Sequence, residues 1–295
     1  MSILVGGGTG FIGRYVAKLG ARKGFKVISV SRKAGPNCLT WNDVSRAGLP
    51  DDCVAVVSMS GEPILQPFKR WTEEMKQIIK ESRVDKTKLL RQAITSSTKP
   101  PKVFVSFSGI ACYKPHLTRE YTELDQVEPY DFLSQLTREW EDAGRLPEGG
   151  PTRSVILRTG IVLGNEGGVI QNIKLPFSLG LGGPMGSGKQ WFPWIHVEDL
   201  AGIVLHAIEN DQVTGVLNGT SPNPVLSQEF TKAYASALHR PHLIPLPSFV
   251  VSTVFGAEAG PVLLDGQKVL PKRTLESGYR FQYPTVQAAC KQLVS

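Results

Sequence analysis

The chain of 295 residues has little cysteine, no long apolar run and no cluster of like charges. Its four cysteines, Cys38, Cys53, Cys112 and Cys290, lie far apart and form no C-x-x-C pair, so neither a zinc site nor a disulfide framework is indicated. No apolar run reaches the roughly 18 residues of a membrane span. The sequence therefore predicts a soluble protein in a reducing, cytoplasmic setting, with no bound metal and no membrane partner.

Basic residues exceed acidic ones, with a net charge of +7 and a pI near 9.2, but Lys and Arg are spread along the chain without a run of five. Because nucleic-acid binding requires a concentrated basic patch, no nucleic-acid partner is expected. The hydrophobic content of 41% can form one large domain, or a domain with an appended lobe.

Short β-rich runs alternate with helical patterns along the first half of the chain. The predicted strands are Ile3–Val5, Lys26–Ser31, Cys53–Ser60, Lys102–Ser108 and Arg153–Thr159. The predicted helices are about Phe11–Arg22, Thr72–Ser96, Phe132–Ala143 and Leu200–Glu209. This alternation predicts an α/β fold of the Rossmann type, a doubly wound parallel sheet that binds ligands at the carboxyl ends of its strands.

The composition changes at about Gly164, where stretches rich in glycine, aromatics and proline replace the regular alternation. We expect a Rossmann domain over residues 1–163 and a smaller C-terminal substrate lobe over residues 164–295. Residues 195–210 are expected to pack back on the first domain. Because the first strand is expected from about residue 2, no leader peptide is expected.

The stretch GGGTGFIG lies between a predicted strand and a predicted helix, the context in which a glycine motif indicates a dinucleotide site. In this motif Gly7 allows the tight turn, Gly10 lets a pyrophosphate approach the backbone, and Gly13 lets the helix lie close to the sheet. Amides at the start of the helix then face the phosphate oxygens. The spacing G-x-x-G-x-x-G resembles that of the short-chain dehydrogenase/reductase superfamily.

The second predicted strand ends in Ser31-Arg32-Lys33, with no carboxylate before Asp43. Members that prefer NAD usually carry an acidic residue at this position, where it binds the ribose hydroxyls of the adenosine. A guanidinium instead binds a 2′-phosphate through two hydrogen bonds. The sequence therefore predicts NADP(H), held by Arg32 with Ser31 as a second donor.

Two further segments are candidates for cofactor contact. Met59, Ser60 and Gly61 follow the third strand, where the superfamily has a turn against the adenine and ribose, and Gly61 permits close approach. Two alternatives are open for the Arg83 side chain in the middle helix. It either points toward the cofactor phosphates or forms a surface salt bridge with nearby carboxylates.

Several motifs together resemble the SDR39U family of atypical short-chain dehydrogenases over essentially the whole chain: GGGTGFIG, VSRK, SGEPI, SRVDKT, FSGIACY, LRTGIVLG, LGLGGPMGSGKQWFPWIHVEDLAGI and LLDGQKVLPKRTLESGYRF. The resemblance implies an NADP(H)-dependent oxidoreductase of unknown substrate. It also implies a small family-specific C-terminal segment at about residues 246–293.

The proton relay of the superfamily is missing. Working members use a Tyr-x-x-x-Lys pair, and none of the seven tyrosines has a lysine at the fourth following position. Leu133 and Thr137 stand where the pair belongs. The remaining candidate phenol is Tyr113, with Ser108 to polarise a substrate carbonyl. The alternative is that Tyr113 packs at a strand end and Ser108 satisfies backbone groups.

The segment around residues 191–199 leaves further alternatives open. Trp191, Phe192 and Trp194 either line an apolar substrate pocket or belong to the core. His196 is a candidate pocket residue, and Asp199 is expected to be a helix N-cap.

Three functions are compatible with the sequence. The first is an NADP(H)-dependent oxidoreductase acting on a small carbonyl or alcohol, the second a nucleotide-sugar epimerase or dehydratase, and the third a non-catalytic NADP(H)-binding sensor or scaffold. The substrate is not indicated, and a homodimer is left open. The predicted catalytic residues are Tyr113 and Ser108; the predicted cofactor residues are Gly7, Thr9, Gly10, Phe11, Ile12, Gly13, Ser31, Arg32, Met59, Ser60, Gly61, Arg83 and Ile161.

Overall fold

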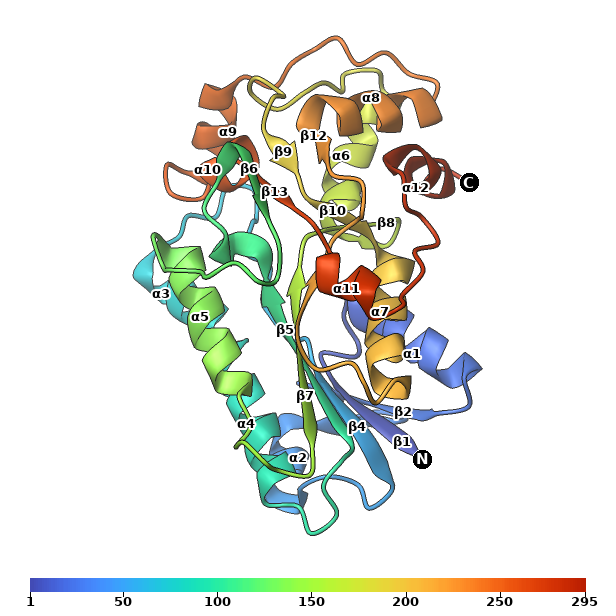
Figure 1. Cartoon of the computed structure of the whole chain (residues 1–295). Coiled ribbons are helices and arrows are strands. Elements are labelled where there is room, and N and C mark those ends of the chain that lie inside the picture. The colour runs from blue at the N-terminus through green and yellow to red at the C-terminus, as the bar shows by residue number, and fades with distance from the viewer.

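A seven-stranded parallel sheet forms the centre of the larger part of the molecule (Figure 1). The structure is a computed structural model that describes residues 1–295. Across the sheet the strands lie in the order β11 (Gly215–Gly219), β7 (Arg153–Thr159), β5 (Val103–Gly109), β4 (Cys53–Ser58), β1 (Ser2–Gly6), β2 (Lys26–Ser31) and β3 (Cys38–Thr40). Every neighbouring pair is parallel, so the predicted doubly wound α/β fold is confirmed.

The central strands are buried on both faces because their residues are almost continuously apolar. All five residues of β1 are buried, and every residue of β5 except its last. Strands covered on both faces read as continuous rather than alternating apolar runs, which is why the sequence signal was strong here. The two edge strands, β3 with three residues and β11 with five, were not predicted.

Helices cover the two faces of the sheet (Figure 1). On one face α1 (Phe11–Arg22) packs against α7 (Val197–Glu209), and both contact the sheet. The other face is covered by α2 (Trp41–Ala47), α4 (Val84–Thr95) and α5 (Phe132–Gly144). The helix at residues 197–209 thus returns from the second half of the chain to the sheet, where Leu200 and Ile203 are fully buried.

The single helix predicted over Thr72–Ser96 is wrong, because the chain forms α3 (Glu73–Glu81) and α4 with a break at Ser82 and Arg83. The Ser82 hydroxyl donates to the Ile79 carbonyl and accepts from the Glu62 amide at 2.9 Å. This second bond ties the helix end to the loop after β4. A tertiary contact of this kind leaves no trace in the helical periodicity.

The smaller lobe has its own apolar core. Its helices are α6 (Gly168–Ser178), α8 (Ser227–Ala237), α9 (Ser248–Phe255), α10 (Pro261–Leu264) and α12 (Val286–Gln292). Three two-stranded sheets complete it: β8 (Ile161–Gly164) with β10 (Trp194–His196), β9 (Trp191–Phe192) with β12 (Val225–Leu226), and β6 (His116–Tyr121) with β13 (Gln267–Val269). Phe192 and Trp194 are buried in this core, so of the two alternatives for them the structure supports packing.

The C-terminal part is fastened to α7 through a buried carboxylate. The expectation that Asp199 is an N-cap is wrong, because His196 is the N-cap and accepts the Glu198 amide. Asp199 instead accepts hydrogen bonds from the amides of Gln282 and Tyr283, at 2.7 and 2.9 Å. Burial raises the pKa of this carboxyl.

No helix of the structure combines the length and apolar character that a membrane crossing requires.

Candidate cofactor site

The glycine turn follows β1 at the carboxyl edge of the sheet and is shaped by close backbone packing. Gly7 has a φ of +83°, a conformation that only glycine adopts without strain. A Cβ on Gly7 would lie 2.9 Å from the Ser60 Cα, so the turn touches the loop after β4. A Cβ on Gly13 would clash with the Gly7 carbonyl oxygen. The roles expected for Gly7 in the turn and Gly13 in close packing therefore agree with the geometry.

The start of α1 presents unpaired amide donors. Gly10 is the N-cap and provides no capping side chain, and the first turn contains no acidic residue. The first intrahelical bond goes from the Arg14 amide to the Gly10 carbonyl at 3.0 Å, so the amides of Phe11, Ile12 and Gly13 have no protein acceptor. Thr9 and Gly10 are exposed beside them. Free amides at the positive end of a helix fit an anionic group such as a pyrophosphate.

The Phe11 ring closes one side of the turn. It packs on the glycines of the β8–α6 connection: Cβ atoms on Gly164 and Gly167 would each lie 2.6 Å from its ring. Ile161, the first residue of β8, is half-buried at the same edge. The turn is thereby joined to the smaller lobe.

The loop after β2 carries a cation without a counterion. Arg32 is exposed and forms no salt bridge and no side-chain hydrogen bond. The Ser31 hydroxyl donates to the Lys33 carbonyl at 2.7 Å and accepts from the Lys33 amide at 3.2 Å. Ser31 thus organises the loop in this structure, while the Arg32 guanidinium remains free for a ligand.

The loop after β4 is held by a buried arginine. Ser60 donates to the Ser82 carbonyl, and a Cβ on Gly61 would lie 2.8 Å from the Arg83 guanidinium carbon. Arg83 is 7% exposed and donates to the carbonyls of Ile79 and Glu62, at 3.1 and 2.9 Å. It therefore makes no surface salt bridge.

The Arg83 guanidinium lies against the Trp140 ring, with 5.4 Å from its carbon to the ring centroid, and its Nε has no partner. Burial lowers its pKa to about 10, so the group remains a cation at neutral pH. Its contacts position the loop that carries Met59 to Gly61 rather than reaching the glycine turn.

Ser108 and Tyr113 lie in a closed polar network beside α5. Ser108 donates to the Glu141 carboxylate at 2.9 Å, and Glu141 receives two further bonds from Arg158, at 2.8 and 3.0 Å. Arg158 also donates to the Tyr113 hydroxyl at 3.0 Å. That hydroxyl is within 3.0 Å of the Asn218 side-chain oxygen. Every polar group of this network has a protein partner.

The position of Tyr113 does not suit a proton donor to substrate. Its side chain is 1% exposed, and burial raises the pKa of its phenol against the lowering effect of Arg158. The geometry therefore supports the structural alternative for Tyr113. The contact of Ser108 matches neither prediction, polarising a substrate carbonyl or satisfying backbone groups. Its hydrogen-bond partner is the Glu141 carboxylate. Thr137 is buried and donates to the Ser134 carbonyl, so it does not replace the missing lysine.

Sequence reasoning missed Glu141, Arg158 and Asn218, which hold this network together. The one available signal was a charged residue inside an apolar strand pattern, RSVILRT, since a buried charge requires a partner. His196 is also buried, with its Nε2 2.9 Å from the Gln292 side-chain oxygen and its pKa lowered by burial, so it faces no open site.

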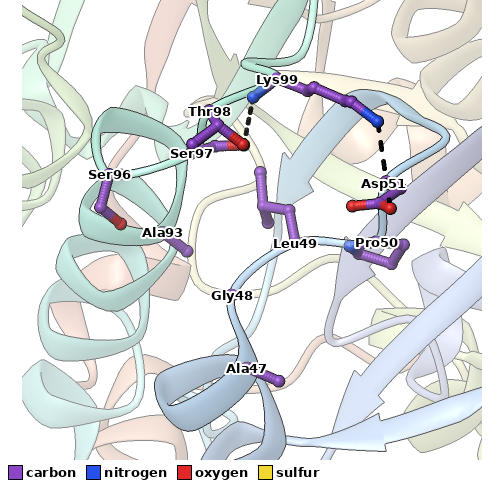
Figure 2. A pocket seen from close by; sticks show the side chains of 10 residues that line it. All are labelled: Ala47, Gly48, Leu49, Pro50, Asp51, Ala93, Ser96, Ser97, Thr98 and Lys99. Carbon is purple, nitrogen blue, oxygen red and sulfur yellow. Dashed lines mark hydrogen bonds and ion pairs between the residues drawn. The ribbon is translucent and has the colours of Figure 1, made fainter.

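One surface hollow is remote from the glycine turn. It lies at the opposite edge of the sheet, between the ends of α2 and α4 and the loop before β4 (Figure 2). Lys99 approaches Asp51 at 4.0 Å across it, and the side chains around it are short or exposed. It contains no constellation of catalytic groups.

Comparison with known proteins agrees with this geometry. The model of the NAD dependent epimerase/dehydratase family matches residues 3–218. The chain belongs to this family. A second model, a domain of unknown function designated DUF1731, matches residues 246–293. Within the epimerase/dehydratase family, human epimerase family protein SDR39U1 is 48% identical to the chain over the full length of both.

Two solved structures of the epimerase/dehydratase type show how closely the fold is shared. Human SDR39U1 (isoform 2), crystallised with NADPH, superposes with a TM-score of 0.97 at 48% identity, covering all of this chain and 99% of that one. A nucleoside-diphosphate sugar epimerase from Corynebacterium glutamicum has a TM-score of 0.79 at 26% identity and covers all of this chain but 58% of its own. The resemblance to SDR39U proteins inferred from the motifs is confirmed.

Proposed function

We propose that this protein binds NADP(H) at the carboxyl edge of its sheet. The pyrophosphate would lie on the free amides of Phe11 and Ile12, and the 2′-phosphate on Arg32. The observation that carries the proposal is the exposed Arg32 guanidinium without a counterion, beside a turn whose backbone donors are unpaired. The NADPH in the structure of human SDR39U1 supports it.

Charge at the end of β2 argues for the phosphorylated cofactor. No carboxylate stands between Ser31 and Asp43, and the Asp43 carboxylate is engaged in the capping box of α2 with Thr40. An anionic 2′-phosphate would therefore lie beside one or two basic side chains, Arg32 and Lys33, and beside no carboxylate. Hydrogen bonds to charged groups contribute about 1.5–3 kcal/mol each.

The test is calorimetric titration of the protein with NADPH and with NADH, repeated with Arg32→Asp. We expect a clear preference for NADPH that the variant loses, with Kd for NADPH rising about tenfold to 150-fold. The matched control is Arg22→Asp, the same charge change at the far end of α1. Equal affinity of the wild type for both dinucleotides would overturn the assignment of Arg32, and absence of binding would overturn the site.

For the chemistry, we propose an NADP(H)-dependent oxidoreductase acting on a small carbonyl or alcohol. When bound, the nicotinamide supplies or accepts a hydride, and the proton comes from a group other than a Tyr-Lys pair. Family membership and the NADPH of the human relative support this. Oxidation of NADPH in the presence of a panel of small carbonyls is the direct assay, and conversion of a nucleoside-diphosphate sugar without net redox would favour the epimerase alternative instead.

A non-catalytic NADP(H) binder is the second candidate, and one observation favours it. Tyr113 and Ser108, the two predicted catalytic residues, are engaged in hydrogen bonds within the protein. Tight NADPH binding together with the failure of both substrate assays is the result that this candidate predicts.

A further inference from the structure

Two segments of the smaller lobe expose large apolar side chains at a density found nowhere else on the molecule. Sixteen large hydrophobic residues of the protein are exposed, and seven of them fall within residues 175–181 and 243–249. Their side chains are between 39 and 80% exposed: Leu175, Leu179, Leu181, Leu243, Ile244, Leu246 and Phe249. We call these seven residues the apolar face.

The two segments run side by side, so their exposed residues stand on neighbouring stretches of the chain. The Leu246 amide donates to the Pro184 carbonyl, and the Gly186 amide to the Leu246 carbonyl, both at 2.9 Å. The Arg240 Nε donates to the Ser178 carbonyl at 2.8 Å. The segments lie in the upper part of the molecule in Figure 1, where α6 and the chain between α8 and α9 meet.

The exposure is a consequence of how α6 packs. The helix turns Ile170 and Phe177 into the core of the lobe, where they are 0 and 5% exposed. Leu175 lies in the helix and Leu179 is its C-cap, four residues later. Both side chains remain exposed to water. Rotation of the helix to hide these leucines would expose Phe177 instead.

The sequence on either side of the apolar segments contains no acidic residue. Residues 167–197 and 230–257 contain no Asp or Glu, although the average of the chain, 26 acidic residues in 295, would place about five in these 59 positions. The same stretches contain Lys174, Lys189, Lys232 and Arg240. The two segments and their sequence neighbours therefore combine exposed apolar residues with cations and no acid.

We propose that the apolar face docks on an anionic lipid bilayer. Protruding aliphatic and aromatic side chains enter the boundary between headgroups and acyl chains, while Lys and Arg beside them are attracted by anionic headgroups. Both contributions are present on this face, on a lobe that carries no membrane-spanning helix. This is peripheral attachment, and it revises the expectation of no membrane partner.

A second copy of the chain is a poorer occupant of the same face. Pairing two identical faces would bring their lysines and arginines together, and the two sequence stretches supply no carboxylate to neutralise them. The attachment does not depend on the proposed NADP(H) binding, so the two can be tested separately.

The experiment is co-sedimentation of the full-length protein with unilamellar vesicles of phosphatidylcholine alone and of phosphatidylcholine with one quarter phosphatidylserine. We expect binding to the anionic vesicles, at least tenfold weaker binding to the neutral ones, and weakening as NaCl is raised. A double variant, Leu243→Ser with Ile244→Ser, should bind the anionic vesicles at least tenfold more weakly.

The matched control is the pair Leu117→Ser and Leu124→Ser, two leucines that are 66% exposed outside the apolar face. This variant should bind vesicles like the wild type, and thermal melting of both variants verifies that they are folded. Failure of the wild type to bind anionic vesicles would overturn the proposal. So would equal losses in the two variants, or a wild-type dimer in gel filtration that the apolar-face variant alone converts to a monomer.

Discussion

Two arginines at the carboxyl edge of one sheet have opposite environments. Arg32, after β2, is exposed and unpaired, whereas Arg158, at the end of β7, is 5% exposed and donates to Glu141 and Tyr113. The difference shows which part of the sheet edge is available to a ligand. The half with the glycine turn has free hydrogen-bond donors, whereas the donors of the half with Tyr113 are bonded within the protein.

The comparison can be tested most strongly by removing the counterion of Arg158. Glu141→Ala leaves a buried guanidinium without its carboxylate, and we expect a loss of about 3–5 kcal/mol in the free energy of unfolding, measured by chemical denaturation. The control is Glu139→Ala on the same helix, whose partner Lys80 lies at 2.7 Å in a half-exposed surface pair worth about 0–1 kcal/mol. Equal losses in the two variants would mean that the network is open to water.

A smaller loss of stability is expected when the Tyr113 hydroxyl is removed. Tyr113→Phe removes the hydroxyl that pairs with Arg158 and Asn218, and it should lower the free energy of unfolding by about 1–3 kcal/mol while the Kd for NADPH stays unchanged. If NADPH oxidation by a carbonyl is found, the variant should retain it. A fully stable variant that had lost only turnover would instead make Tyr113 catalytic.

The smallest effect on stability is expected at the turn itself. Gly10→Ala keeps an allowed backbone, with φ −76° and ψ 178°, and its Cβ meets only the Gly7 carbonyl oxygen at 3.2 Å, so stability should change by less than about 1 kcal/mol. Calorimetry should nevertheless show NADPH binding weakened at least tenfold, because the methyl group occupies the approach to the amides.

Gly150→Ala is the control for the turn, since its Cβ likewise meets one carbonyl oxygen at 3.3 Å, in an exposed loop. If Gly10→Ala bound NADPH as the wild type does, the free amides of α1 would not be the pyrophosphate site.

Features that depend on neighbouring residues were predictable from the sequence. The bounds of α1, β2 and β7 agree with the prediction, because short β-rich runs and a helix started by glycines and ended near Gly24 are specified by adjacent residues. The cofactor residues proposed for the turn follow from the same local pattern.

Features that depend on distant partners were not predictable. The break between α3 and α4 comes from the loop at Glu62, and the closure of the Tyr113 site comes from residues more than 25 positions away. Asp199 is a residue type typical of an N-cap, but it accepts a hydrogen bond from the Gln282 amide, 83 residues later. Hydrogen-bond partners at such separations have no signature in a single sequence.

The sequence by itself thus determined the parallel-sheet fold, the glycine turn and the cation that follows the second strand, because each is set by contiguous residues and by backbone stereochemistry. Only the tertiary structure decided which polar groups at the sheet edge remain free. Burial and pairing depend on side chains that folding brings together, and the same process leaves Arg32 and the apolar face in water while it closes the site around Tyr113.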